Sequence, residues 1–147
     1  MANAGRFIVI EGGEGAGKSR LLQALGERLG TGGREVVLTR EPGGTALGEQ
    51  IRSLVLRDLA VGDHLAELLL FEAARAHLAA TVIRPALERG AIVLCDRFAA
   101  SSIAYQGFGR GLGRDVVERA NAIATGGLAP DLTLLLDLPV EAGLARR

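Results

Sequence analysis

Residues 7–19 read FIVIEGGEGAGKS, and this stretch decides the fold. Its apolar start, 7–10, is typical of a strand buried on both faces of a sheet. The segment from Gly12 to Ser19 fits the pattern G-x-x-x-x-G-K-[ST] of a phosphate-binding loop. Leucines then recur at helical spacing over 18–29. The stretch therefore predicts a strand, a phosphate-binding loop and a helix in succession.

Each residue type in the loop suits phosphate. Glycines let the backbone turn its N–H groups inward, and the helix N-terminus adds partial positive charge. Lys18 is the single lysine of the sequence, so a compact ammonium is favoured at this place, where it can lie between two nucleotide phosphates. Ser19 offers a hydroxyl to Mg²⁺. The predicted nucleotide-binding loop consists of Gly12, Gly13, Glu14, Gly15, Ala16, Gly17, Lys18 and Ser19.

The composition excludes several classes of protein. At 147 residues, 48% of them hydrophobic, the chain suits a single domain, 1–147, with an aliphatic core. A formal net charge of zero argues against a nucleic-acid partner. The single cysteine, Cys95, excludes an internal disulfide and a Cys-based zinc site, and we expect a buried thiol. Because we find neither a signal peptide nor a membrane-length apolar span, we expect a cytoplasmic protein without a membrane partner.

Strands and helices alternate along the sequence. We expect further strands over 35–39, 91–95 and 132–136. Asp63 is placed to cap a long helix that reaches or kinks at Pro85 and ends by Gly90. Other helices are expected over 45–56, 99–106 and 114–124 and from Val140, with a glycine-rich turn over 107–113. This alternation predicts an α/β fold of three layers, a parallel sheet with helices on both faces.

Charged residues follow the predicted strands at the edge where parallel sheets bind ligands. Arg40 and Glu41 follow the second strand, and Asp96 and Arg97 follow the third. Asp96 is in the position of the P-loop partner for Mg²⁺ or its water shell, with a helix N-cap as the alternative. Arg97 is placed to reach a phosphate. Asp137 follows the fourth strand, but no Arg or Ser cluster comes after it, so we expect a structural role.

Phe71 and Arg75 are four residues apart, on one face of the long helix. A planar ring and a side chain that only donates hydrogen bonds could hold a nucleotide base there. On the spacing alone, a core phenylalanine beside a surface arginine is the favoured interpretation.

Four segments, taken together, carry the motifs of one family: 7–19 (FIVIEGGEGAGKS), 39–45 (TREPGGT), 70–75 (LFEAAR) and 96–107 (DRFAASSIAYQG). In these motifs the sequence resembles the thymidylate kinases, which transfer the γ-phosphate of ATP to dTMP. The resemblance implies the P-loop nucleoside-monophosphate kinase fold, with ATP as donor, Mg²⁺ as cofactor and dTDP for dTTP biosynthesis as product.

The resemblance also implies roles around the base and sugar. Phe71 stacks on thymine, and Arg75 donates to the carbonyl at position 4, where cytosine carries an amino group. Ser102 lies near N3 of the base. Tyr105 packs near the sugar and disfavours a ribose 2′-hydroxyl.

Further implied roles concern the phosphates. Arg97 and Arg52 grip the phosphate of dTMP, Glu14 faces the acceptor, and Pro42 corresponds to a cis-proline of the family. The implied catalytic residues are Lys18, Arg97, Glu14 and Asp96, with Ser19 and Asp96 for the metal. The implied dTMP-binding residues are Glu41, Pro42, Arg52, Phe71, Arg75, Arg97, Ser101, Ser102, Tyr105 and Gln106.

The loop's variable positions, 13–16, contain neither Arg nor Lys. In this respect the sequence resembles the bacterial type, which supplies catalytic arginines from a mobile lid. That lid would follow the helix near Val140, and Arg146 and Arg147 would begin the approach to it. We therefore expect a chain that stops before its lid and last strand.

A homodimer is implied by the resemblance. Helix 45–56 carries Leu47, Ile51, Leu54 and Val55 on one face, and the helix from 63 carries Leu65, Leu68, Leu69, Ala73 and Leu78.

Two other functions stay open at this point. The chain could be a related deoxynucleotide kinase, or a P-loop module that binds ATP and dTMP without turnover.

Overall fold

The computed structural model describes residues 4–57 and 62–146. Within these residues the sheet has four parallel strands in the order β2-β3-β1-β4. The strands are β1 (Arg6–Gly12), β2 (Val36–Arg40), β3 (Ile92–Asp96) and β4 (Leu132–Leu136). Each predicted strand is confirmed to within two residues at either end. Because the strands are parallel, their carboxyl ends meet at one edge, and the charged residues that follow them gather there.

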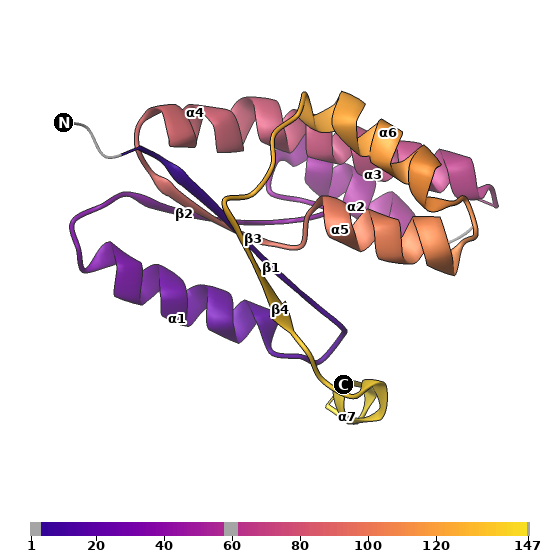
Figure 1. The fold of residues 1–147 in the computed structure, drawn as a ribbon, viewed down its shortest axis with the longest axis horizontal. Coiled ribbons are helices and arrows are strands. Elements are labelled where there is room, and N and C mark those ends of the chain that lie inside the picture. Colours follow the sequence, from indigo (N-terminus) through magenta and orange to yellow (C-terminus); the bar gives the residue numbers. More distant parts are fainter. Residues whose placement is uncertain (1–3, 58–61, 147) are drawn as a thin grey trace.

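Helices cover both faces of the sheet, as predicted (Figure 1). On one face lies α1 (Lys18–Gly30), and the helices between β2 and β4 lie on the other. These are α2 (Ala46–Arg57), α3 (His64–Leu78), α4 (Arg84–Glu88), α5 (Ala99–Ser102) and α6 (Arg114–Thr125), with two π-helical turns, η1 (Ala79–Ile83) and η2 (Ile103–Gly109). The short α7 (Val140–Leu144) follows β4.

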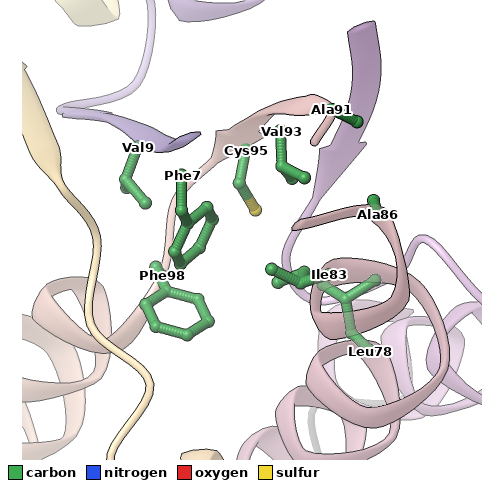
Figure 2. Packing of buried hydrophobic residues seen from close by; sticks show 9 residues of the cluster. All are labelled: Phe7, Val9, Leu78, Ile83, Ala86, Ala91, Val93, Cys95 and Phe98. Carbon is green, nitrogen blue, oxygen red and sulfur yellow. The ribbon is translucent and has the colours of Figure 1, made fainter. Parts of the chain in front are cut away.

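Successive side chains along each strand point to opposite faces of the sheet, so the core has two parts, one on each face. Phe7 and Val9 of β1 point to the α3 and α4 side, where they pack with Cys95, Leu78 and Phe98 (Figure 2). The rings of Phe7 and Phe98 meet edge to face, with centroids 5.0 Å apart. Strand residues of opposite parity, such as Ile10 and Leu94, pack against α1. The central strands β1 and β3 are therefore buried on both faces, whereas most of the edge strand β4 is exposed.

The long helix follows its predicted limits with a change of winding. Asp63 caps it, since its Oδ1 accepts a hydrogen bond of 2.7 Å from the N–H of Ala66. A π-helical turn, η1, separates α3 from α4, and Pro85 lies in the first turn of α4. Proline has no N–H, so the wider turn places this missing donor where a new helical segment starts.

The glycine-rich turn was predicted too early. The chain stays helical through η2 to Gly109, and the N–H of Arg110 bonds the carbonyl of Tyr105 at 2.8 Å. Gln106 and Gly107 are buried, and η2 packs against α6. Tertiary burial here outweighs the poor helix propensity of glycine.

Only part of the predicted apolar face of α2 is buried. Ile51 and Val55 are buried, whereas Leu47 and Leu54 are 42% and 48% exposed. In α3, Leu65 and Leu69 are likewise exposed, and Leu68 is buried. Among the described residues no helix is long and apolar enough to cross a membrane.

Candidate active site

Two cavities open at the carboxyl edge of the sheet. The first, which we call the aromatic cavity, has a volume of about 570 Å³ and includes Phe71, Phe98 and Tyr105 in its wall. The second, the loop cavity, has a volume of about 400 Å³ and is formed partly by the glycine-rich loop. The two cavities share the wall residues Glu41, Arg52 and Arg97.

The glycine-rich loop is held by Lys18. Its Nζ donates to the carbonyls of Gly12 and Gly13, at 2.9 and 2.8 Å. Burial, followed by the nearby charge of Arg97, lowers the pKa of Lys18. Gly17 precedes α1 with a positive φ of 92°, and no side chain caps the helix. The N–H groups at the start of α1 therefore have no side-chain cap to compete with a phosphate.

Helix α7 packs behind this loop. Gly15 has a positive φ of 71°, and a Cβ there would collide with the carbonyl oxygen of Gly143. Arg146 extends from the end of α7 into the wall of the loop cavity, where its NH1 donates to the carbonyl of Gly15 at 3.4 Å. Arg147, named with it in the sequence, lies outside the described residues. The guanidinium of Arg146 is thus a second cation, after Lys18, in contact with the glycine-rich loop.

Ser19 and Asp96 lie next to each other in the wall of the loop cavity. The Ser19 hydroxyl donates to Oδ2 of Asp96 at 3.3 Å, and Oδ1 of Asp96 is buried without a partner. Asp96 is not a helix cap, because Phe98 holds that position in α5. A hydroxyl and an unpaired carboxylate oxygen fit Mg²⁺, which commonly takes one or two protein oxygens and completes its shell with phosphate and water. The described residues contain no group of three or more His, Cys, Asp and Glu that could hold a metal.

Arg97 adopts a left-handed backbone conformation, with φ of 70°. Its N–H bonds the carbonyl of Ile10 at 2.9 Å, and its own carbonyl accepts from the thiol of Cys95 at 3.1 Å. Burial raises the pKa of Cys95 well above its usual value, so this thiol stays protonated and structural, as predicted. The Arg97 guanidinium lies 5.3 Å from the centre of the Tyr105 ring. The strained backbone thus directs this cation to the junction of the cavities.

Glu11 supports this turn from β1. Its two carboxylate oxygens accept from the N–H of Phe98 at 3.0 Å and from the hydroxyl of Ser101 at 2.7 Å. The same Ser101 oxygen accepts from NH1 of Arg97 at 3.2 Å. Ser101 therefore links a predicted phosphate ligand to a buried carboxylate that we did not predict.

Arg75 is buried, with 1% of its surface exposed, so it is not the surface arginine of the alternative interpretation. Its Nε and NH2 lie 2.8 and 2.7 Å from Oε2 of Glu41. Its NH1 donates to Glu72 and Asn121, both at 2.7 Å, and NH2 donates to Ser102 at 3.0 Å. These contacts occupy all five donors of the guanidinium and fix it in the wall of the aromatic cavity.

Two carboxylates share this single cation. Burial raises the pKa of Glu41 to about 7, with Arg75 opposing the shift, and burial also raises the pKa of Glu72. Oε1 of Glu41 and Oε2 of Glu72 are buried without partners. The cluster is therefore held by one strong cation and is costly to ionise fully.

The remaining predicted residues also gather here. The peptide bond between Glu41 and Pro42 is cis, as the resemblance implied, and the carbonyl of Pro42 accepts from Arg52 at 2.8 Å. Burial lowers the pKa of Arg52. The aromatic cavity is lined by Glu14, Glu41, Pro42, Arg52, Phe71, Arg75, Arg97, Ser101, Ser102, Tyr105 and Gln106. The loop cavity is lined by Gly15, Gly17, Lys18, Ser19 and Asp96, whereas Gly12, Gly13, Ala16 and Asp137 are not in its wall.

Several site residues escaped the sequence analysis. Glu72 lies three residues before Arg75, so helical spacing could have found it. Glu11 interrupts an apolar strand, which is a weaker signal. Asn121, on α6, accepts a hydrogen bond from Arg75 although the two residues are 46 positions apart in the sequence. Glu67 and Arg110, which also form a hydrogen bond, are 43 positions apart. Contacts over such separations leave no local pattern.

A P-loop on a parallel sheet, with a second cavity meeting it at a cluster of arginines, defines the class of P-loop nucleoside-monophosphate kinase folds. Comparison with known proteins then identifies the family. The sequence model described as thymidylate kinase matches residues 10–147, and this chain belongs to that family.

Individual relatives agree. A thymidylate kinase of Thermosynechococcus vestitus is 54% identical over 155 residues, covering 97% of this chain and 64% of the relative. One from Gloeobacter violaceus is 56% identical, covering 96% of this chain and 66% of the relative. A crystal structure of thymidylate kinase from Ehrlichia chaffeensis superposes with a TM-score of 0.87 at 39% identity, over 97% of this chain and 76% of that one. The chain thus spans about two thirds of the length of the curated relatives.

Proposed function

We propose that this chain is the catalytic core of a thymidylate kinase, which transfers the γ-phosphate of ATP to dTMP and yields dTDP and ADP for dTTP biosynthesis. One observation carries the proposal: the loop cavity and the aromatic cavity meet at Arg97, Arg52 and Glu41. Two phosphorylated ligands entering from opposite sides would bring their phosphates together at this junction.

The aromatic cavity suits thymine. Phe71 provides a flat ring for stacking, and Arg75 offers N–H donors to a carbonyl at position 4 of the base. The contact of Arg75 with Ser102 is its longest, so a carbonyl would share or replace this bond with least loss. Arginine cannot accept a hydrogen bond, and the amino group of cytosine would be opposed by donors. Tyr105 would pack near the sugar, and Ser101, Ser102 and Gln106 supply polar groups around the base.

The phosphate chemistry needs positioning and positive charge. The acceptor is a phosphate oxygen of dTMP that is ionised at neutral pH, so no strong general base is required. Lys18 would exchange its loop carbonyls for oxygens of ATP, while Arg97 and Arg52 hold the phosphate of dTMP in line. Glu14 lies in the wall of the aromatic cavity and would face the acceptor.

The metal would be held by Ser19 and Asp96, whose unpaired Oδ1 supports this assignment. When bound, Mg²⁺ offsets the charge of the transferred phosphoryl group.

We also propose that the protein is cytoplasmic and forms a homodimer. Two copies would be in contact through α2 and α3, because Leu47, Leu54, Leu65 and Leu69 are exposed there.

The test is direct chromatographic measurement of dTDP from ATP and dTMP with Mg²⁺ present. Product from dTMP in preference to dUMP and dCMP would support the proposal. Preference for another deoxynucleotide would favour the related kinase instead. Binding of ATP and dTMP without product would favour a nucleotide-binding module, and absence of dTMP binding would overturn the assignment of the aromatic cavity.

A further inference from the structure

A cluster of three side chains, Glu67, Gln106 and Arg110, lines a part of the aromatic cavity that the proposed phosphate chemistry does not use. Glu67, in the first turn of α3, accepts a hydrogen bond of 2.9 Å from Nε2 of Gln106. Arg110 donates to both carboxylate oxygens of Glu67, at 3.3 and 3.2 Å. All three residues line the cavity, and Gln106 is 4% exposed.

The carboxylate fixes which end of the Gln106 amide faces the cavity. Because Arg110 donates to both oxygens of Glu67, both oxygens act as acceptors, and Gln106 therefore directs its NH₂ group to Glu67. The opposite orientation would place two acceptor oxygens against each other. The amide oxygen, Oε1, consequently points away from Glu67, and it is an obligate acceptor.

We propose that Glu67 is a positioning residue for base selection, because it holds Gln106 with Oε1 presented to the base. This inference rests on the proposed function and adds a specificity element to it. Thymine and uracil carry an N–H at N3 that can donate to such an oxygen, whereas N3 of cytosine is an acceptor and would oppose it. The donor that Arg75 now directs to Ser102 and the acceptor of Gln106 together match the adjacent carbonyl and N–H of a thymine-type base.

Arg110 has a separate part in the cluster. It neutralises Glu67 and is itself partly exposed, with 43% of its side chain accessible.

The test is calorimetric measurement of dTMP and dCMP binding by the chain and its variants. Glu67→Gln allows the Gln106 amide to turn over, because a neutral amide can pair with either end. We expect the ratio of dTMP affinity to dCMP affinity to fall by about tenfold, the upper range for one hydrogen bond between neutral groups. Glu118→Gln, which breaks the exposed pair of Glu118 with Arg114, is the matched control.

An unchanged ratio in Glu67→Gln would overturn the inference, because a merely structural cluster would not set the preference between the two bases. If Glu67→Gln does not fold, Gln106→Met removes the same acceptor and should lower the ratio equally; an unchanged ratio there also overturns the inference. Failure of the unaltered chain to bind dTMP would instead count against the proposed function.

Discussion

Arg75 is a buried cation between two buried carboxylates, and this arrangement makes stability depend on pH. The folded-state pKa of Glu41 is raised to about 7, above its usual value of 4.5. The folded chain therefore holds a proton that the unfolded chain releases. The resulting stabilisation is fully present below pH 4.5 and is lost as the pH rises to about 7.

Glu41→Gln removes this dependence. Between pH 5 and pH 7.5, stability of the unaltered chain should fall relative to the variant by about 1–3 kcal/mol, from the size of the shift. Urea unfolding at both pH values measures the difference. If the free energy of unfolding changes equally with pH in both chains, Glu41 does not hold the extra proton, and this explanation of the cluster is wrong.

Lys18 is the residue on which phosphate transfer should depend most directly. Lys18→Ala removes the ammonium that holds the loop carbonyls and would contact the phosphates. We expect turnover to fall by about 10²–10³-fold, as for loss of one preorganised electrostatic group. Initial rates of dTDP formation measure it, with Arg89→Ala as a control because Arg89 forms an exposed pair with Glu35. A near-normal rate would exclude the assigned role.

Glu11 supports Arg97, which we propose as a phosphate ligand, through Ser101. In Glu11→Gln one of the two oxygens becomes an NH₂ group, so the N–H of Phe98 or the hydroxyl of Ser101 loses its acceptor. We expect dTMP to bind about tenfold more weakly, because Arg97 is no longer held at the junction. Calorimetry with dTMP measures this, and Glu35→Gln serves as the exposed control. Equal dTMP affinity in both variants would show that the turn is stable without Glu11.

At the scale of elements, the helix from His64 carries much of the site. It presents Phe71, Glu72 and Arg75 to the aromatic cavity and cluster, and its start is fixed by the Asp63 cap. The change of winding at η1 lets it continue past Leu78 into α4, which packs on the sheet. Stability of this element should therefore depend on its N-terminal cap.

Asp63→Ala leaves the N–H of Ala66 without its side-chain acceptor. We expect the free energy of unfolding to fall by about 1 kcal/mol, while Asp63→Ser or Asp63→Asn should retain most of it. Urea unfolding of the three variants measures this. A loss as large in Asp63→Asn as in Asp63→Ala would argue against capping as the cause.

At the scale of the whole molecule, two helices show apolar side chains that the core does not use. Leu54 of α2 and Leu69 of α3 are 48% and 55% exposed. If a second copy covers them, Leu54→Asp should place a charge in the interface and weaken association by at least about tenfold. Analytical ultracentrifugation measures this, with Gln23→Asp on α1 as control, because α1 covers the opposite face of the sheet. Equal association of both variants, or a monomeric unaltered chain, would exclude this interface.

Much of the fold could be predicted because its signals are local. The stretch over 7–19 contains an apolar strand, glycines at turns and a lysine beside a helix start, and the structure places each accordingly. The strands follow from short apolar runs, and the cap at Asp63 follows from helix chemistry. The end of η2, over 107–109, was mispredicted as a turn because the burial of Gly107 is not a local property.

The sequence by itself determined the order of strands and helices, the phosphate-binding loop and the edge of the sheet at which charged residues collect. Only the tertiary structure decided that Arg75 is enclosed by Glu41, Glu72 and Asn121, and that Glu67 orients Gln106. The physical reason is that strand and helix formation depend on neighbours within a few residues, which spacing records. Pairing of buried polar groups instead depends on which distant segments the packed core brings within hydrogen-bond distance.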